Sequence, residues 1–270
     1  VVAGFQGINE NGDITTLGRG GSDTTAVALA AKLQCGCEIY TDVDGIYTVD
    51  PRLFPSARKL NVISYEEMIE MSSLGSGVME TRSVEIAQKY NVAIYVALSS
   101  EDWPGTTIKE YDVNMENKGI TGLSVSDMDL MVTMNHVPYD GKNISMIFGE
   151  LARMDVNIDM ISQTAPYHGS VNLSFTAPKS DEDMVQIVAD KIVEKFNDIE
   201  VDIEKDITKL SVVGIGMRSQ SGVAAKMFEI LAENNIAFKQ VTTSEIRISY
   251  VIDTINKQKA LEAVARGFNL

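Results

Sequence analysis

Thr15-Thr16-Leu17-Gly18-Arg19-Gly20-Gly21-Ser22-Asp23-Thr24-Thr25-Ala26 is a glycine-rich turn that leads directly into a predicted helix, residues 24–33. Its glycines allow positive φ angles and a close approach of the backbone to a ligand, and Ser22 and Asp23 are residue types that begin helices. The free amides and the dipole of a helix start favour an anion, and Arg19 adds a planar set of donors. The stretch therefore predicts a phosphate or carboxylate site, or more simply a capped helix after a loop.

Strands are predicted on both sides of this turn. Val1–Phe5 has the pattern of a short buried strand, residues 9–13 that of a turn, and residues 38–41 that of a second strand rich in β-formers. Polar residues at the C-terminal end of a strand lie where open α/β sheets hold ligands. Asp42 and Asp44 are therefore candidates to approach a metal-bound nucleotide, and an Asp-Gly turn in a polar loop is the alternative.

Further helices and strands complete an α/β unit. Ser64 and Glu67 have the spacing of a capping box at the start of a helix that runs to about Met71. Residues 80–90 have the pattern of an amphipathic helix and residues 92–96 that of a buried strand. This alternation predicts a largely parallel sheet, and a polar, turn-rich segment places the domain boundary at 118.

An internal repeat with a spacing of about 80 residues follows that boundary. Each copy has the order strand, helix, strand, strand and a closing helix, which predicts two α+β units with a βαββαβ pattern, residues 119–200 and 201–270. The helices are expected at 144–154 and 221–234, and the closing helices at 181–196 and 257–267. Positions that align are Leu130 with Leu210, Val132 with Val212, Phe148 with Phe228, Leu151 with Leu231 and Ile158 with Phe238.

The composition excludes several classes of protein. The 270 residues carry a net charge of −15, which argues against a nucleic-acid partner. No long uncharged apolar run and no signal peptide are present, so we expect a cytoplasmic protein without a membrane partner. Cys35 and Cys37 lack a Cys or His cluster around them, so no metal site of the protein's own is predicted. The chain begins without Met in the middle of a predicted strand, and we expect a fragment of a longer polypeptide.

Long motifs throughout the chain, in the same order, closely resemble the aspartokinase (aspartate kinase) family. The resemblance implies the amino-acid kinase fold followed by two ACT regulatory domains, in which the second ACT unit can be nested within the first. The motifs are Phe5–Gly7, Thr15–Ala26, Ile39–Thr48, Asp50–Arg52, Ile63–Met68, Asn157–Gln163 and Thr242–Ile246.

By this resemblance, the expected reaction is ATP-dependent phosphorylation of the side-chain carboxylate of L-aspartate to 4-phospho-L-aspartate, which opens the route to lysine, threonine and methionine. ATP and Mg²⁺ are the expected cofactors. Arg19 and Asp23 are the expected catalytic residues. The expected aspartate-binding residues are Arg19, Gly20, Gly21 and Ser22. The expected ATP-binding residues are Thr41, Asp42, Tyr47 and Arg52.

The ACT units imply feedback regulation by an amino acid and a homodimer formed through them. The effector is expected to be lysine or threonine, between which the sequence does not choose. The expected effector-binding residues are Asn157, Asp159, Gln163 and Thr243.

Departures from the family pattern limit what this chain is expected to do alone. The family's Lys-Phe-Gly-Gly strand, which carries the catalytic lysine, is not in the sequence, so we predict no appreciable kinase activity for residues 1–270 by themselves. Gly77 stands where the family often has a lysine near ATP. The alternative function is an amino-acid-binding regulatory module without activity of its own.

Overall fold

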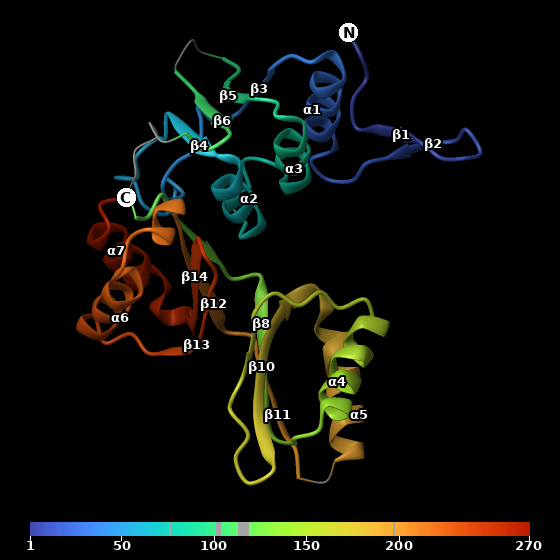
Figure 1. Ribbon diagram of the computed structural model, residues 1–270, viewed down its shortest axis with the longest axis vertical. Coiled ribbons are helices and arrows are strands. Elements are labelled where there is room, and N and C mark those ends of the chain that lie inside the picture. The colour runs from blue at the N-terminus through green and yellow to red at the C-terminus, as the bar shows by residue number, and fades with distance from the viewer. Residues whose placement is uncertain (76, 101–103, 113–118, 197) are drawn as a thin grey trace.

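The computed structural model describes residues 1–75, 77–100, 104–112, 119–196 and 198–270. Three α/β units follow one another along the long axis of the molecule (Figure 1). We call them the N-terminal unit (residues 1–112), the central unit (residues 119–126 and 207–270) and the distal unit (residues 129–204). The described parts of the chain contain no helix with both the length and the apolar character needed to cross a membrane.

A four-stranded sheet with three helices forms the body of the N-terminal unit. The strands lie in the order β3 (Cys37–Thr41), β5 (Ile94–Leu98), β6 (Thr106–Lys109) and β4 (Val62–Ser64). The helices are α1 (Gly21–Leu33), α2 (Tyr65–Ser73) and α3 (Thr81–Tyr90). β3 pairs with β5 and β4 with β6 in parallel, whereas β5 and β6 are antiparallel. The predicted α/β class and its largely parallel sheet are confirmed.

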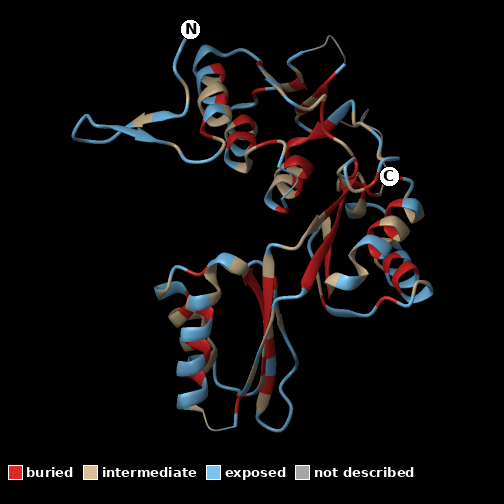
Figure 2. Ribbon diagram, turned by 180° about the vertical axis from the view of Figure 1, so that it is seen from behind, coloured by how far each residue is buried: buried red, intermediate tan, exposed pale blue. Residues whose placement is uncertain are grey.

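Apolar side chains from the helices and the sheet form one core in this unit, seen as buried segments in Figure 2. The spacing of Val27 and Ala30 on α1, and of Val84 and Ala87 on α3, places each pair on one helix face, and all four are buried. α1 is capped at its C-terminus by Gln34, which adopts the left-handed conformation. A very short connection then leads into β3, so that α1 must run antiparallel to that strand.

The first residues differ from the prediction of a buried strand. Val1 and Val2 are exposed and Phe5 has a φ of 68°. The strand pairing begins instead at β1 (Gln6–Ile8), which forms a projecting hairpin with β2 (Ile14–Thr16). The side chain of Asn9 accepts hydrogen bonds from the amides of Asn11 and Asp13 and closes the turn. An Asx-type turn therefore fixes the register of these strands.

The distal unit is a sheet covered on one face by two helices (Figure 1). Its strands lie in the order β11 (Glu200–Glu204), β8 (Asp129–Pro138), β10 (Ser170–Pro178) and β9 (Ile161–Gln163). Its helices are α4 (Gly141–Arg153) and α5 (Glu182–Lys195). Leu130, Val132 and Ile147 are fully buried between sheet and helices.

The central unit repeats this arrangement. Its strands lie in the order β13 (Phe238–Thr243), β14 (Arg247–Asp253), β12 (Ile207–Val213) and β7 (Gly122–Ser126). Its helices are α6 (Val223–Glu233) and α7 (Lys257–Gly267).

The chain therefore enters the central unit through β7, builds the whole distal unit, and then returns. A division at 200/201 differs from this pairing at two strands, because β7 joins the central sheet and β11 extends to Glu204 in the distal one. Periodicity predicts that a strand exists, whereas its partner is decided by tertiary packing.

Candidate functional site

The turn before α1 has the backbone geometry of a ligand-binding loop. Gly20 is the N-cap of α1 with a φ of 69°, and within the described structure no side chain caps this helix. The amides of the first helical turn, at Ser22 and Asp23, therefore lack a side-chain acceptor, and the positive end of the helix dipole lies there. Ser22 and the neighbouring Arg19 are both exposed. This arrangement favours an anion at the turn.

Close packing explains the two adjacent glycines. A Cβ on Gly20 would lie 2.6 Å from Cβ of Glu80, and a Cβ on Gly21 would lie 2.8 Å from Cβ of Leu17. Glu80 immediately precedes α3, so a segment 60 residues away in the sequence covers the turn. Sequence patterns did not identify Glu80, because no local signal announces such a tertiary contact.

Asp23 lies beside this same neighbour. Partial burial raises the pKa of Asp23, the Glu80 backbone and the Ser22 side chain act against this increase, and the nearby charge of Glu80 adds to it. Asp23 is therefore close to the contact between Gly20 and Glu80.

A second group of predicted residues surrounds the loop after β3. The hydroxyl of Thr41 donates to Oδ1 of Asp42 at 3.2 Å. The Arg52 guanidinium donates to both oxygens of Asp50, and this hydrogen bond, together with smaller effects of the Asp50 and Asp42 charges, raises the pKa of Arg52. The side chain of Arg52 is 85% exposed, and it lies close enough to Asp42 for the Asp42 charge to affect its pKa.

Asp44 is engaged by other side chains of the same loop. It accepts hydrogen bonds from the Tyr47 hydroxyl, at 3.1 Å to each oxygen, and from Nζ of Lys59 at 3.1 Å. Burial alone would raise the pKa of Asp44, but the bonds from Lys59 and Tyr47 lower it below its ordinary value. Lys59 also donates to the carbonyl of Pro104. Sequence reasoning missed Lys59, because no local pattern relates it to Asp44.

Topology brings the turn and the loop to one edge of the sheet. α1 runs antiparallel to β3 and packs against it, so the N-terminus of the helix lies at the edge where β3 ends. Arg19, Gly20, Gly21, Ser22 and Asp23 therefore share an edge with the group after β3, which comprises Thr41, Asp42, Tyr47 and Arg52. In open α/β sheets this edge is the usual place for ligands.

The predicted effector residues lie elsewhere, where the distal and central units meet. Asn157 and Gln163 are exposed. Gln163 ends β9 and Thr243 ends β13, and these two strands are in contact. Asp159 is paired with two cations: Lys209 lies 2.8 Å from its Oδ2 and Arg247 lies 3.5 Å from its Oδ1. Burial would raise the pKa of Asp159, but the hydrogen bond and charge of Lys209, with the charge of Arg247, hold it below its ordinary value.

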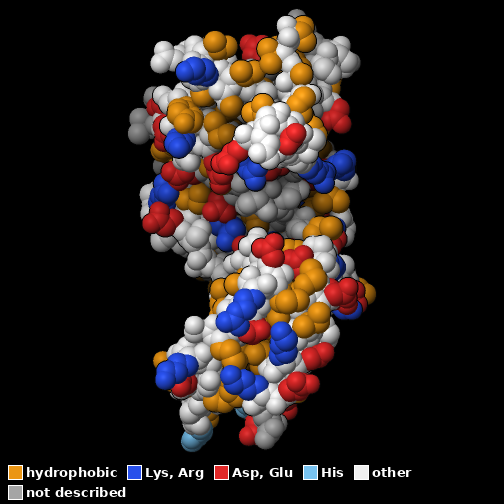
Figure 3. Space-filling model, turned by 90° about the vertical axis from the view of Figure 1, so that its right-hand side faces the viewer, with side chains coloured by type: hydrophobic (Ala, Val, Ile, Leu, Met, Phe, Trp, Pro, Cys, Tyr) orange, Lys and Arg blue, Asp and Glu red, His pale blue; other side chains and the backbone are white. Residues whose placement is uncertain are grey.

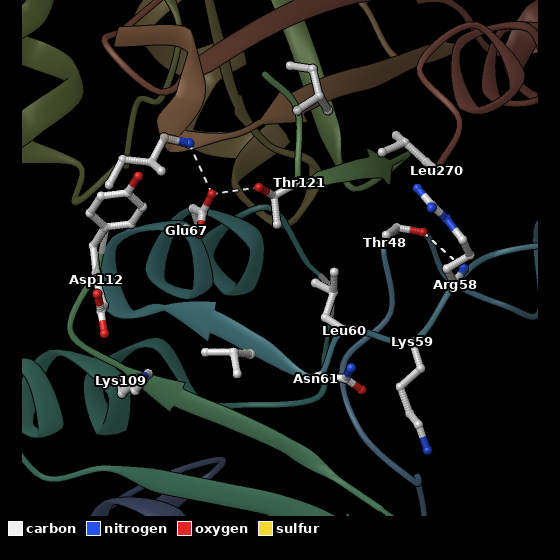
Figure 4. Close-up of a pocket in the computed structure, with 14 residues that line it drawn as sticks. Thr48, Arg58, Lys59, Leu60, Asn61, Glu67, Lys109, Asp112, Thr121 and Leu270 are labelled. Atoms are coloured by element: carbon white, nitrogen blue, oxygen red, sulfur yellow. Dashed lines mark hydrogen bonds between the residues drawn. The ribbon is translucent and has the colours of Figure 1, made fainter. Parts of the chain in front are cut away.

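A cavity of about 480 Å³ lies between the N-terminal and central units (Figure 4). Its cations do not converge, because Arg58 donates to the carbonyl of Asn269, Lys59 points away, and Lys109 lies across the cavity from Arg58. None of the predicted site residues lines it. The cavity is a joint between units rather than the site indicated by the sequence.

The part of the chain that the structure describes contains no group of three or more His, Cys, Asp or Glu that could hold a metal ion. Asp42 is exposed, and its hydrogen bond comes from the neighbouring Thr41. A single exposed carboxylate fits an ion held mainly by phosphate oxygens, as Mg²⁺ is with a nucleotide.

Comparisons with known proteins agree with this architecture. Residues 1–97 match the model of the amino acid kinase family, and residues 210–268 match an ACT domain model. The aspartokinase of Bacillus sp. (strain MGA3) is 46% identical over 271 residues, which span 100% of this chain and 66% of that protein.

Solved structures give the same result. The Clostridium acetobutylicum aspartate kinase has a TM-score of 0.86 at 25% identity, over 98% of this chain and 62% of that one. A chain of the aspartokinase alpha and beta subunits is 31% identical with a TM-score of 0.52, over 56% of this chain and 99% of that one. With an N-terminal unit of the amino acid kinase type and two interleaved ACT-type units, this chain belongs to the aspartokinase family.

Proposed function

We propose that this chain binds L-aspartate and ATP and supplies that part of an aspartate kinase, in which the side-chain carboxylate of aspartate is phosphorylated to 4-phospho-L-aspartate. One observation carries the proposal: the glycine-rich turn, with an α1 start that no described side chain caps, shares a sheet edge with the polar loop after β3. The chain spans 66% of the length of its curated relative, so the activity of the whole protein is part of this proposal.

The turn is suited to hold aspartate. Arg19 presents a guanidinium that pairs with a carboxylate through two parallel hydrogen bonds. The backbone at Gly20 and Gly21 lets the substrate approach, and Ser22 adds its amide and its hydroxyl. Asp23 lies beside the Glu80 backbone and would help to orient the turn. The nucleophile is already an anion, so the site must hold two anions together and does not need a strong base.

The loop after β3 is suited to the nucleotide. Tyr47 presents its ring while its hydroxyl is held by Asp44, and Arg52 offers a guanidinium to phosphate oxygens. Thr41 and Asp42 lie at the strand end, where Asp42 would contact Mg²⁺ bound to the phosphates. When bound, the ion would neutralise phosphate charge. Lys59 fixes Asp44 and so keeps the loop in shape.

Regulation by an amino acid follows from the ACT-type units, with Asn157, Asp159, Gln163 and Thr243 around the effector. E. coli aspartokinase III has been solved with aspartate and ADP in one state and with lysine and aspartate in another. Lysine and threonine are both candidates here. The exposed edge of the distal sheet, strand β11, is the part of an ACT unit through which we propose a homodimer.

Calorimetry tests the substrate site. L-Aspartate and Mg-ATP are titrated into the wild-type chain, Arg19→Gln and the matched control Arg153→Gln, whose arginine is exposed on α4. We expect Arg19→Gln to weaken aspartate binding at least about tenfold, as expected for a lost charged hydrogen bond, while Arg153→Gln binds like the wild type. Equal affinity in all three proteins would contradict the assignment of Arg19.

A regulatory module without activity of its own is the second candidate, because two of the three units are of the ACT type. Binding of lysine or threonine without any binding of Mg-ATP would favour it. We propose that residues 1–270 alone do not release ADP appreciably in the presence of aspartate and Mg-ATP, because the Lys-Phe-Gly-Gly strand is not in this sequence. Robust turnover in a coupled ADP assay would refute that.

A further inference from the structure

One arginine of the central unit touches both neighbouring units. Arg247 begins β14 and places Nη1 3.2 Å from Oε2 of Glu70 on α2, and Nη2 3.5 Å from Oδ1 of Asp159 in the distal unit. The side chains of Arg247 and Glu70 are only 20% and 25% exposed, so solvent screens their interaction less than that of a surface pair. A guanidinium has enough donors, in a fixed planar geometry, to serve two carboxylates at once.

The two cations at Asp159 are held differently. Lys209 is 6% exposed and lies between two carboxylates, 2.8 Å from Asp159 and 3.1 Å from Asp129. Arg247 is more distant from Asp159 and has Glu70 as an alternative partner. An ammonium group that approaches Asp159 therefore displaces Arg247 more easily than it displaces Lys209.

We propose that Arg247 couples the amino-acid site to the N-terminal unit. A ligand ammonium on Asp159 releases Arg247, which then pairs with Glu70 alone, and this changes the contact between the central unit and α2. The inference rests on the proposed function, since it requires an amino-acid ligand at Asp159. Arg247 acts as a positioning residue, because it does not touch the substrates.

Helix α2 connects Arg247 to the glycine-rich turn. It packs against α3, and α3 begins just after Glu80, the residue that covers Gly20. A displacement of α2 therefore reaches the glycine-rich turn through two packed contacts, that of α2 with α3 and that of Glu80 with Gly20. Packed interfaces change between discrete arrangements rather than deforming gradually, which suits this route to regulation.

The internal repeat explains why only one of the two ACT-type units would take the ammonium. At a spacing of 80 residues, the position equivalent to Asp159 is Lys239 and that of Asn157 is Ala237. Lys239 is paired with Glu204 at 2.7 Å and with Asp253 at 3.0 Å. The central unit thus presents a cation where the distal unit presents a carboxylate, and it contributes contacts between units in place of a second ammonium site.

Hydrogen exchange of α2, residues 65–73, tests the coupling. L-Lysine and L-threonine are added to the wild type, Arg247→Gln and the control Arg266→Gln, with binding confirmed by calorimetry. In the wild type and the control we expect ligand to change α2 exchange at least about threefold. In Arg247→Gln, we expect ligand to bind at least as tightly but leave α2 exchange unchanged. An equal response of α2 in Arg247→Gln would overturn the inference. If neither amino acid binds the wild type, the proposed effector site is refuted as well.

A ligand-free measurement separates the bridge itself from the effector site. Urea midpoints are compared for Glu70→Gln, Asp159→Asn and the double variant, each with Arg247 and with Arg247→Gln. With Arg247 present, one carboxylate can hold it when the other is lost, so the urea midpoint of the double variant should fall by more than the sum of the two single decreases. With Arg247→Gln, the two decreases in midpoint should be additive. Glu66→Gln, on the same helix but paired with Arg218, should add with Asp159→Asn in both backgrounds. Additive shifts for Glu70 and Asp159 with Arg247 present would overturn the bridge.

Discussion

Gly20 has no room for a Cβ, because Glu80 occupies the place where one would lie. The glycine-rich turn and its helix were predictable from residues 15–26, since a run of glycines before helix-starting residues is a local signal. The contact that fixes the turn was not, because Glu80 is brought there by the packing of α3 against α1. At the scale of residues, the local half of the site could be predicted and its tertiary support could not.

Substitution of Gly20 by Ala tests this packing. The left-handed φ of 69° costs an L-residue about 1–2 kcal/mol, and the clash with Cβ of Glu80 adds to it, so we expect a loss of about 2–4 kcal/mol in the free energy of unfolding. Gly18→Ala is the matched control, because Gly18 has a similar φ of 82° in open space. Urea denaturation should show a clearly smaller loss for the control, and equal losses would argue against the contact with Glu80.

At the scale of elements, helix α2 is the part of the N-terminal unit that forms ion pairs with the central unit. Glu66 and Glu70 pair with Arg218 and Arg247, and the Glu67 carboxylate is buried between the units (Figure 4). The capping box of Ser64 and Glu67 was predictable and is confirmed. The contacts of the Glu67 carboxylate with the central unit were not predictable, because a capping-box pattern does not indicate which distant residues a carboxylate contacts.

Glu67 accepts four hydrogen bonds and should be the strongest single support of this interface. Ser64 donates its hydroxyl and its amide to Oε2, while the Thr121 hydroxyl at 2.6 Å and the Ile215 amide at 3.0 Å donate to Oε1. Glu67→Ala should reduce the free energy of unfolding by about 3 kcal/mol, since buried donors lose a charged acceptor. Thermal and urea unfolding provide the measurement.

Glu66→Ala is the control for this change, because its ion pair with Arg218 is partly exposed to solvent and should be worth less than about 1 kcal/mol. A loss in Glu67→Ala no larger than that in Glu66→Ala would show that Glu67 does not hold the units together.

At the scale of the whole molecule, ion pairs join the units although the net charge is −15, for example Arg247 with Glu70 and Lys239 with Glu204. The face of the molecule in Figure 3 shows acidic and basic side chains interspersed among hydrophobic ones. The internal repeat was predictable, because apolar residues recur at equivalent positions about 80 residues apart. The interruption of the central unit by the distal unit could not be read from periodicity, because β7 has the pattern of any strand of its length.

The contacts of Asp159 predict how stability depends on pH. Its pKa in the folded chain lies below its value in the unfolded chain, about 3.9. The stabilisation is therefore complete above about pH 5 and is lost as the pH falls through the unfolded value and then through the folded pKa. Between pH 5 and pH 2, Asp159→Asn should lose stability less steeply than the wild type in urea unfolding. Asp183→Asn, an exposed site on α5, should keep the wild-type slope, and a wild-type slope in Asp159→Asn would contradict the assignment.

Backbone amide NMR of the ¹⁵N-labelled chain tests most directly whether the turn before α1 and the loop after β3 are the substrate site of this aspartokinase-family chain. Addition of L-aspartate should shift the amides of Gly20, Gly21 and Ser22, and addition of Mg-ATP should shift those of Thr41, Asp42 and Tyr47. Shifts confined to the residues around the cavity between the units, or no shifts at concentrations up to about 10 mM, where even weak ligands occupy their sites, would contradict it.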